Sequence, residues 1–95
     1  MHARVVSFTL GPGTMDAATA MADEGFKIAK SLNGFVSAVY LVHDEGAGEY
    51  GSVTVWQTEA DADAAAEALR PLLAKSGDKL KGTPEVSKAE VYKPK

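Results

Sequence analysis

One tryptophan and a group of hydroxyls are the side chains in this sequence best suited to bind a ligand. Trp56 ends a strand-like segment, where its flat indole can stack on an aromatic molecule while its N–H donates a hydrogen bond. The hydroxyls expected to orient the same ligand belong to Tyr40, Tyr50, Ser52 and Thr54. The alternative for Trp56 is a core position, in which the indole anchors its strand to the helix that follows.

His43 and Arg70 are the candidates for handling a proton or a negative charge, and they form the predicted catalytic pair. His43 titrates near neutral pH, so as a general base it can remove a phenolic proton, with Asp44 or Glu45 raising its pKa. Arg70 can hold the resulting anion. The alternative for His43 is an exposed hairpin histidine beside an acidic turn residue.

Arg4 is the second of the two arginines, and it shares a strand face with Val6, Phe8 and Leu10. On that face its guanidinium can bind an anionic ligand or cross a subunit interface to a carboxylate. A salt bridge at the rim of the molecule is the plainer interpretation. The residue pattern leaves all three open.

Metal and phosphate sites have little support in the sequence. Cysteine is absent, and His2 and His43 are not accompanied by clustered carboxylates, so neither a metal site nor a cofactor is predicted. Gly11-Pro12-Gly13 lacks the glycine spacing and the lysine of a phosphate-binding loop, and we expect a turn there.

Chain length and charge restrict the class of protein. The chain has 95 residues and no cysteine, so its single core is small and association with a second copy is the remaining means of stabilising it. A net charge of −3 leaves no excess of cations for a nucleic acid. No apolar run reaches the roughly 18 residues of a membrane span. The first residues enter a strand pattern without a hydrophobic leader, which favours a cytoplasmic location for the expected homodimer.

Alternating and three-to-four-residue apolar spacings predict six elements in one domain, residues 1–95. The expected strands are 3–10, 35–43, 49–57 and 85–92, and the expected helices are 14–32 and 59–80. Thr14 and Thr58 are predicted to cap the helices, and Pro71 to kink or divide the second one. This order is that of an α+β, ferredoxin-like β-α-β-β-α-β fold, with an antiparallel sheet and both helices on one face.

The two faces of the third predicted strand differ in character. Gly51, Val53 and Val55 form the more apolar face, which is expected to pack on the helices. The face with Tyr50, Ser52, Thr54 and Trp56 then points away from the helices. The second strand is apolar on both faces, which is unusual for a sheet covered on one side. A second sheet from another copy of the chain is the expected cover.

Several short motifs resemble one known family. They are Gly11-Pro12-Gly13 before the first helix, Asn33-Gly34-Phe35-Val36 at the second strand, and Val53-Thr54-Val55-Trp56-Gln57-Thr58-Glu59-Ala60. Together with the element order they resemble the antibiotic-biosynthesis-monooxygenase-like (ABM) proteins, which are dimeric α/β barrels. The resemblance implies a pocket beside the sheet and an oxygenase that needs no metal or flavin. It carries over to Trp56, and in part to Ser52 and Arg70.

The chain departs from the haem-degrading members of that family. Those members resemble one another in an asparagine on the first strand and a histidine on the second helix, and this sequence has neither. The resemblance therefore implies a cofactor-independent monooxygenase, or an isomerase, acting on a small aromatic or polyketide-like molecule. The alternative is a non-catalytic dimeric barrel that binds a small hydrophobic ligand or acts as a stress or regulatory accessory.

Overall fold

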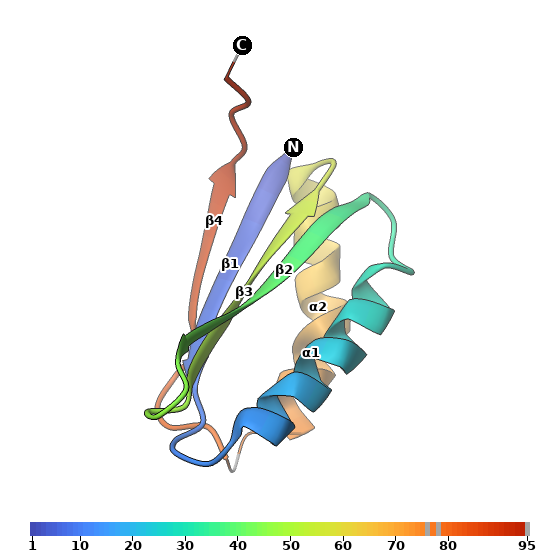
Figure 1. The fold of residues 1–95 in the computed structure, drawn as a ribbon. Coiled ribbons are helices and arrows are strands. Elements are labelled where there is room, and N and C mark those ends of the chain that lie inside the picture. The colour runs from blue at the N-terminus through green and yellow to red at the C-terminus, as the bar shows by residue number, and fades with distance from the viewer. Residues whose placement is uncertain (76, 78, 95) are drawn as a thin grey trace.

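A four-stranded antiparallel sheet with two helices against one of its faces makes up the fold, as seen in a computed structural model that describes residues 1–75, 77 and 79–94 (Figure 1). The elements are β1 (His2–Thr9), α1 (Met15–Ala29), β2 (Phe35–Asp44), β3 (Glu49–Trp56), α2 (Glu59–Lys75) and β4 (Glu85–Glu90). The strands lie in the order β2-β3-β1-β4. The predicted ferredoxin-like α+β fold is thus confirmed.

The second helix departs from the prediction in its length and at its proline. α2 runs through Pro71 as one helix, so the expected division does not occur, and it ends at Lys75 rather than at Leu80. Residues 76 and 78 of the predicted stretch lie outside the described residues. A proline frees the carbonyl four residues earlier, here that of Glu67, which is exposed and can be solvated.

The two threonines predicted as helix caps behave differently. Thr58 is a true cap, because the backbone N–H of Asp61 donates to its Oγ1 at 3.1 Å. Thr14 precedes α1, but its hydroxyl makes no capping bond. The Thr14 hydroxyl donates instead to the carbonyl of Gly11 at 2.6 Å, so it ties the glycine–proline turn to the helix start.

The sheet presents the opposite face to the helices from the one predicted. Tyr50, Thr54 and Trp56 are buried under α1 and α2. The valine face points away from the helices, with Val53 paired between Val5 of β1 and Val39 of β2. Val39 in the middle of this face is 55% exposed. The alternation of β3 was predicted correctly, but the side on which the helices lie was wrong. In β2 a register shift between Phe35 and Ser37 also places Phe35 on the helix side with Trp56, opposite to Val39.

The core between sheet and helices consists of two clusters. One contains Trp56 with Ala29, Ala62 and Ala65, and Phe35 packs against it with its ring centroid 5.5 Å from that of Trp56. The second cluster contains Leu10, Ala18 and Tyr50. A large aromatic ring of β3 therefore fills the space under the helices in each cluster.

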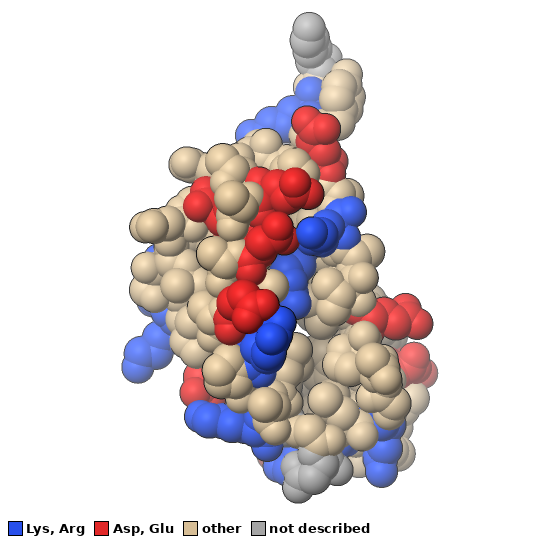
Figure 2. All heavy atoms as spheres, turned by 180° about the vertical axis from the view of Figure 1, so that it is seen from behind, with Lys and Arg blue, Asp and Glu red and all other residues tan. Residues whose placement is uncertain are grey.

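Ion pairs lie on the outer side of α2 and between α2 and β4. Acidic side chains gather on the face opposite to that of Figure 1, with lysine and arginine among them (Figure 2). Lys88 of β4 lies 3.0 Å from Asp63 of α2, and Arg70 lies 2.6 Å from Glu67. Such exposed pairs contribute little to stability. Among the described residues no helix is both long enough and apolar enough to cross a membrane.

Candidate functional site

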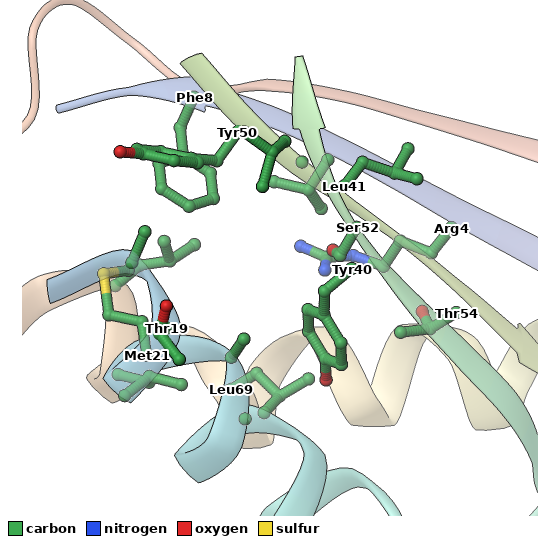
Figure 3. A pocket seen from close by; sticks show the side chains of 18 of the residues that line it. Arg4, Phe8, Thr19, Met21, Tyr40, Leu41, Tyr50, Ser52, Thr54 and Leu69 are labelled. Atoms are coloured by element: carbon green, nitrogen blue, oxygen red, sulfur yellow. The ribbon is translucent and has the colours of Figure 1, made fainter. Parts of the chain in front are cut away.

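A cavity of about 260 Å³ lies between the inner face of the sheet and the two helices (Figure 3). The strands line it with Arg4, Val6, Phe8, Tyr40, Leu41, Val42, Tyr50, Gly51, Ser52 and Thr54. The helices line it with Met15, Ala18, Thr19, Met21, Ala22, Gly25, Leu69, Leu72 and Leu73. Its wall is predominantly apolar, with a few polar groups, which is the usual character of a small-molecule site.

The cavity exists because small residues face one another between the two core clusters. α1 turns Ala18, Ala22 and Gly25 toward the sheet, at steps of four and three residues that keep them on one side of the helix. Opposite them the sheet presents the short side chain of Ser52. These short side chains do not fill the distance between the two surfaces, so a space remains beside Tyr40. This stripe of small residues was visible in the sequence and was missed as a sign of a cavity.

Arg4 of β1 is the charged residue among the described residues that line the cavity, and its guanidinium points into it (Figure 3). The side chain is half-buried, and this burial lowers the pKa of the guanidinium from its ordinary value. An arginine nevertheless stays protonated in proteins. No ion pair or hydrogen bond joins Arg4 to another side chain in the described part of the chain. The rim salt bridge considered for it is therefore not formed.

Tyr40 of β2 crosses the cavity toward the helices. Its hydroxyl lies 3.6 Å from the point where a Cβ on Gly25 would stand, so the glycine of α1 makes room for it. A tyrosine phenol is protonated at neutral pH, and partial burial raises the pKa of Tyr40 further from its ordinary value. The hydroxyl can therefore donate a hydrogen bond to a ligand.

Tyr50 of β3 contributes its ring to the cavity but has its hydroxyl engaged elsewhere. The hydroxyl lies 3.0 Å from Oγ1 of Thr14. Because the Thr14 hydroxyl donates its own hydrogen to Gly11, Tyr50 must be the donor in this bond. Phe8 packs beside Tyr50 with a centroid separation of 6.0 Å. Tyr50 is thus a rigid aromatic wall rather than a free hydroxyl.

Trp56 does not line the described cavity but contacts a residue that does. Its side chain is completely buried in the first core cluster and is absent from the described cavity lining. The indole N–H donates to Oγ1 of Thr54 at 2.9 Å, and Thr54 does line the cavity. The geometry therefore matches the core alternative for Trp56, which fixes the orientation of Thr54 and leaves no indole N–H for a ligand.

The structure does not bring the predicted catalytic pair together in the cavity. The imidazole of His43 covers Gly51, because its Nε2 lies 2.8 Å from the point where a Cβ on that glycine would stand. The alternation of β3 places that Cβ on the helix-free face of the sheet. Arg70 is exposed on α2 and paired with Glu67. Neither His43 nor Arg70 belongs to the described lining of the cavity.

The described residues contain no group of three or more His, Cys, Asp or Glu side chains that could hold a metal ion. The cavity lining, as far as it is described, contains no imidazole or carboxylate. What the site offers is a cation, the phenol of Tyr40 and the short hydroxyls of Ser52 and Thr54, inside an apolar wall. A third short hydroxyl in the lining, that of Thr19, donates its hydrogen to the carbonyl of Met15. It is equipped to bind and orient a small organic molecule.

Comparison with known proteins confirms the fold. No protein-family profile and no curated protein sequence matches the chain. Solved structures do match it, among them one described as an antibiotic biosynthesis monooxygenase, with a TM-score of 0.81, 13% identity, and coverage of 98% of this chain and 100% of that one. SnoaB, a cofactor-independent oxygenase from Streptomyces nogalater, has a TM-score of 0.74, 19% identity, and coverage of 98% and 94%.

A third structure, the NE2512 protein of unknown function from Nitrosomonas europaea, has a TM-score of 0.78 and 21% identity, and covers 99% of this chain and 91% of its own. At identities this low the likeness establishes a common fold. The chain therefore shares the fold of these proteins over nearly its whole length.

Replacing Trp56 by Phe tests its place in the core. We expect the free energy of unfolding to fall by about 1–3 kcal/mol, because the ring shrinks and the Thr54 oxygen loses its donor. Affinity for a cavity ligand such as 2-naphthol should change by less than about twofold. Urea unfolding followed by circular dichroism and calorimetric titration measure the two effects. Weakened binding with unchanged stability would instead support the pocket-wall interpretation.

Proposed function

We propose that this protein binds a small aromatic molecule in the cavity between its sheet and its helices. The observation that carries the proposal is the cavity itself, an apolar space with aromatic walls at Phe8, Tyr40 and Tyr50 and a few inward polar groups. Its volume of about 260 Å³ lies below the roughly 300 Å³ at which drug-sized pockets begin, so the occupant is small.

A catalytic role, cofactor-independent oxygenation, is the second candidate, and the likeness to SnoaB favours it. In such a reaction the ionised ring gives electrons to dioxygen, and the protein supplies a dry, oriented site. The described lining holds no imidazole or carboxylate to remove a proton, so the substrate must ionise readily by itself. The same lack weakens the isomerase alternative, which needs a group that accepts and returns a proton.

Oxygen consumption tests this second candidate. With an easily ionised hydroquinone as substrate, the wild-type protein should raise the rate of oxygen uptake above that of the buffer, as measured with an oxygen electrode. Ala22→Leu, which fills the cavity, should return the rate to the buffer value. If the wild type and Ala22→Leu both give the oxygen-uptake rate of the buffer, the chain is a binding protein without oxygenase activity.

We propose that the protein forms a homodimer. The helix-free face of the sheet carries a row of valines, Val39, Val53 and Val5, on three adjacent strands, and the described helices do not cover it. Water contact with such a row is unfavourable, and the matching face of a second copy removes it. The arrangement supports a pair of sheets packed face to face.

Filling the cavity tests the binding proposal. Ala22 lines the cavity from α1, so Ala22→Leu should weaken the binding of 2-naphthol about tenfold or more while the fold stays intact. Ala20 lies on the exposed side of the same helix, and Ala20→Leu adds the same atoms outside the cavity. Isothermal titration calorimetry compares the three proteins. Equal affinities in all of them, or no binding to the wild type, would reject the cavity as a binding site.

A charge on the valine row tests the dimer. Val39→Glu should shift the protein from dimer to monomer at micromolar concentration in sedimentation velocity, because burying an unpaired carboxylate costs several kcal/mol. Val86→Glu is the matched control, since Val86 is similarly exposed, at 50% against 55%, but its register partner Val6 lies on the helix side. A wild-type monomer, or a dimer that tolerates Val39→Glu, would contradict the prediction.

A further inference from the structure

The positive charge of Arg4 is not balanced inside the cavity. Among the described lining residues it stands alone as a charged group, and in the described part of the chain no carboxylate pairs with it. Taking a guanidinium partly out of water costs free energy unless a partner compensates for it. The direction of the Arg4 pKa agrees, because burial lowers it and no opposite charge raises it again.

The acidic residue that pairs with the cation beside Arg4 is already engaged. Lys88 of β4 is the register partner of Arg4, so the two cations lie side by side on the inner face of the sheet. Asp63 of α2 pairs with Lys88 at 3.0 Å. Asp63, with Glu59 at longer range, compensates the charge of Lys88. The positive charge left without a partner is that of Arg4, the residue that points into the cavity.

From this balance we infer that the natural ligand is a monoanion, an aromatic carboxylate whose carboxyl group is held by Arg4. This inference rests on the proposed function, because it concerns the occupant of the same cavity. A planar carboxylate matches the fork of a guanidinium with two parallel hydrogen bonds. A dianion such as a phosphate ester would bring one charge more than the cavity balances.

The lack of a general base in the described cavity lining further restricts the chemical class of the ligand. The described cavity lining contains no imidazole and no carboxylate that could deprotonate a neutral phenol. A carboxylic acid needs no such group, since its ordinary pKa of about 4 leaves it ionised at neutral pH. The protonated Tyr40 hydroxyl is a second donor available within the cavity.

The rings that line the cavity specify the body of the ligand. Phe8 and Tyr50 lie together on the sheet side, and Tyr40 crosses the cavity (Figure 3). Aromatic rings stack favourably with one another at centroid distances of about 4.5–7 Å. A flat ring system can stack on the aromatic residues of the cavity wall, and one carboxylate on that ring system can pair with Arg4.

The test compares two probes with the same bicyclic body, 2-naphthoate and 2-naphthol, which is neutral at pH 7. Calorimetric titration of the wild type should give tighter binding of 2-naphthoate by about tenfold to a hundredfold. Arg4→Gln should abolish this preference and leave 2-naphthol binding nearly unchanged. Arg4→Lys should retain part of it, because lysine keeps the charge but not the fork.

Arg70→Gln is the matched control, because it removes the other arginine, which lies outside the cavity lining. It should leave the preference for 2-naphthoate intact. Thermal unfolding of free Arg4→Gln should occur at the same or a higher temperature than that of the wild type, since an uncompensated buried charge is removed. A merely structural arginine would lower the unfolding temperature and weaken both probes equally.

The outcomes separate this inference from the proposed function. If 2-naphthol binds and responds to Ala22→Leu but 2-naphthoate binds no better, or if Arg4→Gln keeps the preference, the cavity is a binding site and the carboxylate inference is wrong. If Arg70→Gln removes the preference, the anion is held on α2 and the inference is wrong. If neither probe binds the wild type, the proposed function itself fails.

Discussion

The space between the sheet and the helices depends on two aromatic residues of the same strand. Trp56 and Tyr50, six positions apart on β3, each belong to one of the two core clusters. Between them β3 presents Ser52 and Thr54, and α1 presents alanine and glycine. The large rings set the separation of the two layers, and the small residues cannot close it. An interior is otherwise packed at close to crystal density, so an unfilled space of this size is a property of the sequence.

Polar interactions are distributed unevenly over the molecule. The charged pairs of α2, such as Arg70 with Glu67, lie at the surface, where water screens them and their contribution to stability is small. Arg4 has the opposite situation, because it is half-buried and unpaired. A group that costs stability in the free protein is typical of a binding site, where its partner arrives with the ligand. The fold tolerates this cost because the two aromatic clusters hold the layers on either side.

The two faces of the sheet carry different kinds of side chain. The inner face carries the hydroxyls, the arginine and the aromatic rings that surround the cavity, while the outer face carries the valine row. β1 and β3 are central strands, so each contributes alternate residues to both faces. Val5 lies next to Arg4 in sequence, and Val53 lies next to Ser52 and Thr54. Packing of a second copy against the valine row would therefore stiffen the strands that position the cavity side chains.

The sequence by itself determined the order of the elements and the alternation of β1 and β3, because these depend on local spacing and on turn residues. It did not reveal the register shift after Phe35 in β2, which places that ring against Trp56 rather than on the face of Val39. It could not determine which face of the sheet the helices cover. β3 is half-apolar on both faces, and the side is set by the handedness of the connections between strands rather than by hydrophobicity. For the same reason tertiary structure alone decided that Trp56 is a core residue, that His43 and Arg70 lie away from the cavity, and that Arg4 points into it.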